Sequence, residues 1–464
     1  MSDLGFCVHG HFYQPSREDP ISGKIPEEVG AFPYKNWNEL ILSHCYGPNA
    51  ELGNFERISF NFGPTLLNWM EYAHPNVLQN IVSQDRQNYE KHGVGNALAQ
   101  PYHHTILPLS SREDKITQIH WGIEDFFHRF EHEPTGMWLP EAAVDLETLE
   151  IMADFGIEFT ILAPWQAQTH GLDVTQPYFV NLSTGKQITI FFYHQDLSTQ
   201  ISFNPLSTIN ADLFATNSIY PILKNTSKEG AKYLIIASDG ELYGHHQPFR
   251  DKFLEHLMNG SLKNKNIRLL YPALWLREHP ATEEVKIIEN TSWSCHHGVD
   301  RWSIGCDCTP HSEWKRHLRT FAEFVGNIVN DVYLTELKGF SIDIWQMRHN
   351  YIDVLLGKIS ENEFVKKYIP NIVDRNVENR IILLLKAQNE RQRIFTSCGW
   401  FFEDFDRIEP HNILAYCSQA LNYVSAINGI DYYDQCKPLL SEIKSIKTGK
   451  TAMEVFNKFY KRVI

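Results

Sequence analysis

The chain lacks long hydrophobic runs, has few cysteines and carries fewer basic than acidic residues. No stretch of its 464 residues approaches the roughly 18 uninterrupted apolar residues of a membrane-spanning helix. Eight cysteines are too few for a disulfide-built scaffold. Lys and Arg total 42 against 56 Asp and Glu, a formal charge of −14, which argues against nucleic acid or an anionic membrane as the main partner. The first residues show no basic, apolar leader, so we expect a cytoplasmic protein with reduced thiols.

Two common catalytic signatures are also missing. The chain contains no Gly-x-Ser-x-Gly nucleophile elbow and no glycine loop of the kind that cradles phosphate. Aromatic residues, by contrast, make up 13% of the chain and include 11 Trp and 20 Tyr. These rings can stack on sugars or other flat ligands, or fill a large core.

Short apolar runs alternate with amphipathic segments over the first 280 residues. Residues 115–129 and 146–155 have the three- and four-residue apolar spacing of helices. Strands alternating with helices predict a parallel sheet, and this many units predict an α/β barrel. The runs expected to form strands are 6–8, 58–62, 95–99, 135–138, 159–162, 188–192 and 233–237.

The pattern changes beyond about residue 280, where long apolar stripes with few turn residues predict helices over 314–337, 377–397 and 413–427. We therefore expect two domains, a barrel over residues 1–285 and a helical C-terminal domain over residues 286–464.

Polar and aromatic side chains follow six of the expected strands, at the end where a parallel barrel builds its active site. The richest of these segments contains Asp239-Gly240-Glu241 and then His245-His246. Asp-Gly is an ordinary turn signal, but a turn does not need this many ionisable groups. The other residues at strand ends are His9, His11, Gln14, Gln100, His103, His104, Glu141, Trp165, His194 and Asp196.

Glu141 and Asp239 form the best pair for acid–base or nucleophilic chemistry. Each follows a strand and has aromatic or histidine neighbours in sequence, where desolvation and nearby groups can separate two carboxyl pKa values. One ionised and one protonated carboxyl group can cleave a glycosidic bond. Pro140-Glu141 is also compatible with the first turn of a helix, a purely structural alternative.

Two groups of residues leave a metal site open as an alternative, although we expect neither a metal nor another cofactor. One group is histidine-rich, with Asp196 or Asp239 as an oxygen ligand. It comprises His9, His11, His103, His104, His245 and His246. The other combines Cys306-Asp307-Cys308 with Cys295 and His296 or His297, but its spacing is not that of a Cys-x-x-Cys zinc site.

Four segments in order resemble the motifs of glycoside hydrolase family 57, which comprises retaining enzymes that act on α-glucans. The resemblance covers the N-terminal two-thirds of the chain. The segments are His9-Gly10-His11-Phe12-Tyr13-Gln14-Pro15, Gly95 to Pro108, Gly136-Met137-Trp138-Leu139-Pro140-Glu141, and Ser238-Asp239-Gly240-Glu241-Leu242-Tyr243-Gly244-His245-His246.

This resemblance implies a fold and a set of roles. The fold is an incomplete seven-stranded (β/α)7 barrel followed by a helical bundle. Glu141 would be the nucleophile and Asp239 the general acid and then base. Trp138 would be a platform for a sugar ring. Hydrogen bonds to an α-glucan or oligosaccharide substrate would come from His9, His11 and His104, with Gln14 in the first motif.

The chain departs from many members of the family at two positions. Leu98 stands where they have Glu, with Gln100 as a partial replacement, and His246 stands where they have Trp. We expect His245 and His246 to contact sugar, Trp165 to line the substrate site, and Trp302 to help close the cleft. Hydrolysis, glucan transfer and branching stay open, as does the oligomeric state. Two other functions are alternatives, a metal-dependent polysaccharide deacetylase or mannosidase on a related barrel and an inactive glucan-binding protein.

Overall fold

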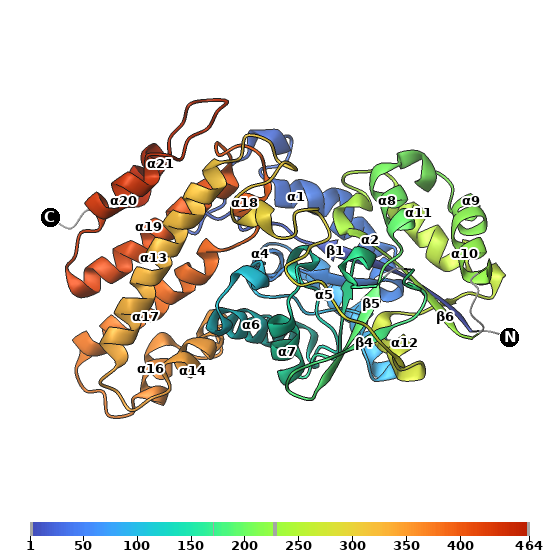
Figure 1. Cartoon of the computed structure of the whole chain (residues 1–464), viewed down its shortest axis with the longest axis horizontal. Coiled ribbons are helices and arrows are strands. Elements are labelled where there is room, and N and C mark those ends of the chain that lie inside the picture. The colour runs from blue at the N-terminus through green and yellow to red at the C-terminus, as the bar shows by residue number, and fades with distance from the viewer. Residues whose placement is uncertain (1–2, 170, 226–229, 462–464) are drawn as a thin grey trace. The chain divides into compact units, whose positions relative to one another are not determined.

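Parallel strands and the helices between them make up the first of two units in the chain (Figure 1). The computed structural model describes residues 3–169, 171–225 and 230–461. The first unit comprises Met1–Ser16, Pro26–Pro101 and Phe126–Trp293, and the second comprises Arg17–Ile25, Tyr102–Asp125 and Ser294–Ile464. The second unit thus includes residues 102–125, which lie within the range that the sequence assigned to the barrel.

The strands and helices of the first unit follow one another in βα order over most of its length. The strands are β1 (Leu4–Phe12), β2 (Ser59–Phe62), β3 (Phe159–Leu162), β4 (Tyr178–Asn181), β5 (Gln187–Phe192), β6 (Lys232–Asp239), β7 (Arg268–Leu269) and β8 (Glu283–Glu284). The helices are α1 (Trp37–Ile41), α2 (Gly47–Glu51), α3 (Asn54–Arg57), α4 (Pro64–Ala73), α5 (Pro75–His92), α7 (Leu146–Asp154), α8 (Gln195–Phe203), α9 (Ala211–Phe214), α10 (Tyr220–Asn225), α11 (Arg250–His256) and α12 (Pro272–Glu278).

Strand β1 is the centre of one four-stranded sheet. It pairs in parallel with β2 on one side and β6 on the other, and β7 also pairs with it. A second sheet has the order β3-β5-β4-β8, with β3 and β5 parallel. Five of the seven expected strands are confirmed as β1, β2, β3, β5 and β6.

The other two expected strands, 95–99 and 135–138, form single bridges rather than continuous strands. Parallel bridges join Phe60 to Ala97, Ala99 to Met137, and Gly136 to Phe159, so they connect the two sheets. Proline explains why these segments stay short. Pro101 and Pro140 closely follow them and have no N–H to donate to a ladder.

The two-residue period of the strands builds the core of the first unit. On β6 the side chains of Tyr233, Ile235 and Ala237 all enter one buried cluster, and Cys7 on β1 enters the same cluster. Residues two apart on a strand share a face. Asp239 continues this series at the carboxyl end of β6, so the core pattern directs it toward the same face as the buried apolar residues.

Helices make up most of the second unit. Residues 112–125 of α6 (Arg112–Phe130) belong to it, followed by α13 (Trp314–Leu337), α14 (Ile344–His349), α15 (Ile352–Leu355), α16 (Glu361–Tyr368), α17 (Arg375–Ile394), α18 (Cys398–Phe401), α19 (Ile408–Asn428), α20 (Tyr433–Leu440) and α21 (Ala452–Phe459). The three long C-terminal helices expected from the sequence are confirmed as α13, α17 and α19, which pack against one another (Figure 1). The expected helices over 115–129 and 146–155 are also confirmed, as α6 and α7.

Local sequence signals set several helix ends. The Asp145 side chain accepts a hydrogen bond from the Thr148 N–H and so caps the start of α7. Ser360 and Glu363 form a reciprocal capping box at the start of α16. Gly429 ends α19 with φ at 74°, a left-handed conformation that glycine adopts without strain. Within the described ranges, no helix is long and apolar enough to cross a membrane.

Apolar burial explains why residues 102–125 belong to the second unit. Tyr102 and Trp121 join a buried cluster with Tyr333 of α13 and Met347 of α14. The indole Nε1 of Trp121 also donates to the carbonyl oxygen of His349, at 2.7 Å. Burial of a large aromatic side chain contributes roughly 1.5–3 kcal/mol to the free energy of unfolding from its buried area alone. The amphipathic face of α6 therefore packs within the helical unit.

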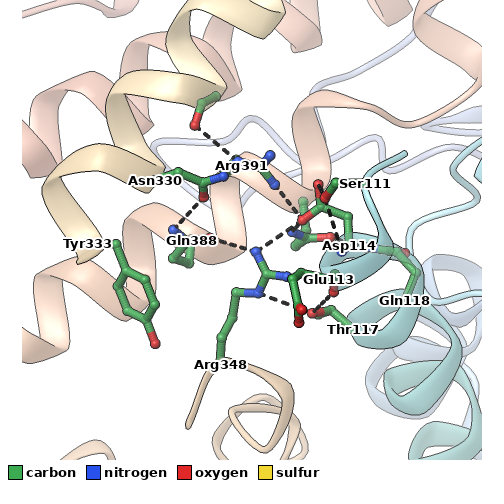
Figure 2. Close-up of polar contacts among 12 residues, drawn as sticks. Ser111, Glu113, Asp114, Thr117, Gln118, Asn330, Tyr333, Arg348, Gln388 and Arg391 are labelled. Atoms are coloured by element: carbon green, nitrogen blue, oxygen red, sulfur yellow. Dashed lines mark hydrogen bonds and ion pairs between the residues drawn. The ribbon is translucent and has the colours of Figure 1, made fainter. Parts of the chain in front are cut away.

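A buried carboxylate links three helices of the second unit (Figure 2). Oδ1 of Asp114, on α6, accepts from Arg391 Nη1 at 2.6 Å and lies 3.0 Å from Arg348 Nη1. Gln388 accepts from Arg348 at 3.2 Å and donates to Asn330 of α13 at 2.9 Å. Burial alone would raise the pKa of Asp114, but the guanidinium groups of Arg391 and Arg348 outweigh burial and hold it below its ordinary value. The network therefore depends on the ionised carboxylate.

Replacing Asp114 with Asn should destabilise the second unit strongly. The Asp114→Asn variant leaves two buried guanidinium groups without their counter-charge, for which we expect a loss of about 3–5 kcal/mol in the free energy of unfolding. Urea denaturation followed by far-ultraviolet circular dichroism measures this loss. The matched control is Asp331→Asn, at an exposed aspartate of α13, which should change stability by less than about 0.5 kcal/mol. Equal stability of the two variants would contradict the role of the network.

Candidate active site

The carboxyl ends of three adjacent strands meet at the candidate site. The parallel register pairs His11 of β1 with Asp239 of β6 on one side and with Asn61 of β2 on the other. Residues at one level of a parallel sheet lie side by side, so the register brings these three side chains together. This is the end of the strands at which α/β folds carry their chemistry.

Asp239 is the last residue of β6, and its side chain keeps part of its surface accessible. Enough protein surrounds the carboxyl group that desolvation, together with the negative charge of Glu141, raises the pKa of Asp239 to about 7. Gly240 follows because the chain passes close to the ring of Phe12. A Cβ atom at Gly240 would lie 2.4 Å from Cδ1 of Phe12, so no other residue fits.

Glu141 lies in a strained turn after the bridge segment 136–137. Its φ is 57° and that of Ala142 is 47°, a left-handed conformation that is uncommon for residues other than glycine. Both backbone and side chain are held by Trp293. The indole Nε1 donates to Oε2 of Glu141 at 3.0 Å, and the backbone N–H of Trp293 donates to the carbonyl oxygen of Glu141 at 2.9 Å. Strained positions of this kind persist where surrounding contacts impose them, often at functional sites.

Glu241 is a third carboxyl group close to the pair, and it is buried. Oε1 accepts from the Tyr46 hydroxyl at 2.7 Å and from the Tyr13 N–H at 3.2 Å. Burial raises the pKa of Glu241 to about 8, and the charge of Asp239 adds to this increase. The hydrogen bond from Tyr46 lowers the pKa but does not outweigh burial. At neutral pH this side chain is therefore mainly protonated.

Two buried histidines and a tryptophan form a stack beside the carboxyl groups. The ring centroids of His9 and His11 lie 4.7 Å and 5.3 Å from that of Trp138. Nδ1 of His9 lies 2.9 Å from the Ser59 hydroxyl, and Nδ1 of His11 lies 3.0 Å from Nδ2 of Asn61. Burial lowers the pKa of His9 to about 3 and that of His11 to about 4. Both rings are therefore neutral at physiological pH, able to donate or accept hydrogen bonds.

Three polar atoms in this cluster are buried and have no hydrogen-bond partner among the described residues. They are Nε2 of His9, Nε2 of Gln100 and Nε1 of Trp138. Gln100 belongs to the cluster because its Oε1 accepts from Asn61 at 2.6 Å. Buried polar atoms are nearly always hydrogen-bonded, so several unpaired ones together indicate a place for a polar ligand.

Four further residues expected at the site also belong to the first unit. The side chain of Gln14 hydrogen-bonds Glu241. Trp165 is 40% exposed, and its Nε1 donates to the carbonyl oxygen of Ser292 at 3.0 Å. His245 and His246 lie on the turn after Glu241, and their backbone N–H groups donate to its carbonyl oxygen at 3.1 Å and 3.0 Å.

His104 and Trp302 belong to the second unit. His104 is buried, has φ at 54°, and its Nδ1 lies 2.6 Å from the hydroxyl of Ser397. Trp302 is buried to 1% exposure within the same unit. The roles expected for these two residues in sugar binding stay predictions.

The histidine-rich metal site considered from the sequence has no matching geometry in the described part of the chain. Two clusters there bring at least three His, Cys, Asp or Glu ligand atoms within 4.8 Å of one another. One comprises Cys295, His297, Cys306 and Cys308, and the other Asp3, Glu278 and His279. Neither contains a strand-end histidine or Asp239.

Sequence reasoning missed several residues that contact the expected ones. Trp293 is not among the residues expected at the site, yet it hydrogen-bonds Glu141. Asn61 was read as a strand residue, yet it bonds both His11 and Gln100. The signal for Asn61 was available, because a polar residue in an apolar run at the end of a parallel strand faces the place where chemistry occurs. No local signal identifies Trp293.

Family models match both parts of the chain. The family described as "Glycosyl hydrolase family 57" matches residues 19–288, more than half of the chain. A domain family of unknown function matches residues 311–463. An α-amylase of Pyrococcus abyssi is 22% identical over 247 residues, which are 53% of this chain and 33% of that protein. A 4-α-glucanotransferase of Thermococcus litoralis is 22% identical over 191 residues, 40% of this chain and 27% of that protein. The chain thus spans a third or less of these relatives.

Solved structures extend the likeness over both units. An exo-type maltose-forming amylase from Pyrococcus sp. ST04 has a TM-score of 0.73 at 16% identity, covering 94% of this chain and 82% of that one. A branching enzyme from Pyrococcus horikoshii has a TM-score of 0.60 at 15% identity, covering 98% and 94%. At such identities the likeness shows the fold, an α/β barrel-type domain with a helical domain.

The raised pKa of Glu241 predicts a pH-dependent effect on stability. Between the ordinary glutamate pKa of about 4.3 and about 8, the folded protein holds a proton that the unfolded chain releases, so stability falls as pH rises through this window. The Glu241→Gln variant lacks this ionisation. We therefore expect the melting temperature of Glu241→Gln, relative to that of the parent, to rise from pH 5 to about pH 8 and to level off above it.

The control for this measurement is Glu56→Gln, the same change at an exposed glutamate of the first unit. Its melting temperature should follow that of the parent across the same pH range. A difference between Glu241→Gln and the parent that did not depend on pH would contradict a protonated Glu241.

Proposed function

The chain belongs to glycosyl hydrolase family 57, and on this premise we propose that it is a retaining glycoside hydrolase or transglycosylase acting on α-glucans. The observation that carries the proposal is the pairing of Glu141 with Asp239. The charge of Glu141 helps to keep Asp239 protonated up to about pH 7, while Trp293 donates to the Glu141 carboxylate. One carboxylate and one carboxylic acid are what glycosidic cleavage requires.

The proposed reaction is a double displacement. An oxygen of Glu141 attacks the anomeric carbon while Asp239 gives its proton to the departing glycosidic oxygen, so the C–O bond electrons leave with that oxygen. A covalent glycosyl ester on Glu141 results. Asp239, now ionised, takes a proton from water or a sugar hydroxyl, which attacks the anomeric carbon and releases Glu141. Two inversions retain the configuration.

The polar atoms around the carboxyl pair support a sugar as the ligand. Nε2 of His9, Nε2 of Gln100 and Nε1 of Trp138 are buried and unpaired, and sugar hydroxyl groups both donate and accept hydrogen bonds. The neutral rings of His9 and His11 suit an uncharged ligand better than an anionic one. The exposed indole of Trp165 supplies a surface on which a sugar ring can stack.

Further parts of the proposal follow from the resemblance. We place Gln14, His245 and His246 among the groups that shape the sugar subsites, while the sugar contacts expected for His104 and Trp302 stay predictions from the sequence. The barrel is expected to have seven parallel strands. Hydrolysis, transfer and branching differ in the acceptor that meets the glycosyl ester, and the carboxyl pair serves all three.

The direct test is substitution of each carboxyl group. Glu141→Gln should lower kcat on maltooligosaccharides by at least about 10⁴-fold, because it removes the nucleophile. Added azide then separates the two roles. Glu141→Ala with azide should give a glycosyl azide of inverted configuration, because azide displaces the leaving group in one step. Asp239→Ala with azide should give a glycosyl azide of retained configuration, because two displacements occur. Chromatographic sizing of the products and their NMR spectra supply both readouts.

The matched control for Glu141→Gln is Glu158→Gln, at an exposed glutamate of the same unit, which should keep full activity. Full activity of Glu141→Gln would overturn the proposal, and so would tight glucan binding by the parent without turnover of any glucan. Shorter products from the parent indicate hydrolysis, redistributed chain lengths indicate transfer, and new branch points indicate branching.

The pKa of Asp239 predicts the alkaline limb of activity. The first step needs protonated Asp239, so kcat/KM should fall as pH rises through about 7, by about tenfold per unit well above it. An α-maltosyl fluoride substrate is the control, because fluoride needs little protonation to depart and should weaken this limb. A profile for maltooligosaccharides that stays flat to pH 9 would contradict the assignment of Asp239 as the acid.

A further inference from the structure

The loop that precedes α13 in the second unit brings together three cysteines and a histidine. Cys295, His297, Cys306 and Cys308 place one ligand atom each within 4.8 Å of all the others. We propose that these four side chains bind one Zn²⁺ ion as a closed, structural site. This inference is independent of the proposed function.

The distances between the ligand atoms match a tetrahedron around zinc. Zn–S bonds of about 2.3 Å and Zn–N bonds of about 2.0–2.1 Å place tetrahedral ligands about 3.8 Å apart for two sulfurs and about 3.5 Å apart for sulfur and nitrogen. Sγ of Cys295 lies 3.5 Å from Sγ of Cys306 and 3.9 Å from Sγ of Cys308. Nδ1 of His297 lies 3.5 Å from Sγ of Cys308 and 3.9 Å from Sγ of Cys295. Four of the six distances between ligand atoms are thus close to those of a tetrahedral zinc site.

Tight turns explain how ligands only two residues apart can converge on one ion. The N–H of Gly298 donates to the carbonyl oxygen of Cys295 at 3.2 Å, and the N–H of Thr309 donates to that of Cys306 at 2.9 Å. Each turn therefore folds back on a pair of ligands. Gly305 leads into the second turn with φ at 82°, where a Cβ atom would lie 2.9 Å from the carbonyl oxygen of Ser312.

The surroundings of the sulfur atoms suit thiolate ligands. Backbone N–H groups of His297 and His296 hydrogen-bond the sulfur atoms of Cys295 and Cys308 respectively. Three thiolates and Zn²⁺ leave one net negative charge on the site. The buried Lys315, whose Nζ donates to Thr309 Oγ1 at 2.9 Å, lies close enough to Cys295 and Cys306 for its charge to interact with them.

The ligand set identifies both the metal and its role. Thiolate-rich tetrahedral sites with one imidazole favour Zn²⁺ over hard cations such as Mg²⁺ or Ca²⁺. Four protein ligands leave no open position for water or substrate, which is the mark of a structural rather than a catalytic zinc site. The loop needs such a cross-link, because Asp300–Trp302 is the one short helix between β8 and α13 in this described part of the chain.

Metal analysis of the 464-residue chain, purified without a histidine tag, tests the site. We expect about one zinc per chain after gel filtration. Cys306→Ser and Cys308→Ser should each lose the metal. The matched controls are Cys398→Ser, at a half-buried cysteine outside the cluster, and His296→Ala, at the exposed histidine next to His297. Both controls should keep the full zinc content. His297→Ala removes one ligand, so a chelator too weak to remove zinc from the parent should remove it from this variant.

A spectroscopic measurement on the parent protein does not depend on the variants folding. Exchange of zinc for Co²⁺ should give thiolate-to-cobalt charge-transfer bands and the strong visible bands of tetrahedral cobalt. Chelation should lower the melting temperature of the parent, and added zinc should restore it. A parent protein that takes up neither Zn²⁺ nor Co²⁺, or that joins Cys295 to Cys306 in a disulfide after purification under reducing conditions, would overturn the proposal.

Discussion

The in-register parallel pairing of β1 with β6 is the constraint on which the candidate active site depends. Side chains alternate along a strand, so residues two apart share a face. His11 and Asp239 therefore lie on the same face of the sheet as the buried residues Cys7, Ile235 and Ala237. A shift by one residue would turn Asp239 away from this face and place Ser238 or Gly240 opposite His11. The apolar core of the first unit therefore determines where its chemistry is located.

Desolvation then gives the carboxyl groups different properties. Asp239 and Glu241 are two residues apart, and burial raises both pKa values, to about 7 and about 8. Their surroundings differ, because Glu241 is held by Tyr46 whereas Asp239 keeps accessible surface and interacts with Glu141. The accessible acid can exchange its proton with a substrate. The buried one holds the Tyr13 backbone, which directly precedes Gln14, in place.

Much of the first unit could be predicted because its signals are local. Apolar runs identified β1, β3 and β6, and the residues at the ends of 135–138 and 233–237 predicted the carboxyl pair. The predictions were less accurate where contacts between distant residues determine the secondary structure or the unit to which a segment belongs. Residues 95–99 and 135–138 have the composition of strands, yet they form single bridges. Residues 102–125 follow such a segment along the chain, yet the burial of Tyr102 and Trp121 places them in the helical unit.

The sequence by itself determined the alternation of strands and helices and the helical C-terminal part, and it predicted the two carboxyl groups, because periodicity, caps and strand ends are properties of neighbouring residues. Only the tertiary structure decided which groups meet. The contact of Trp293 with Glu141 spans 152 residues, and no local pattern encodes it. Likewise, the spacing of Cys295, His297, Cys306 and Cys308 matches no common zinc motif, and the turns of the folded loop bring them together. Burial and convergence depend on residues far apart in the chain, and folding alone places them side by side.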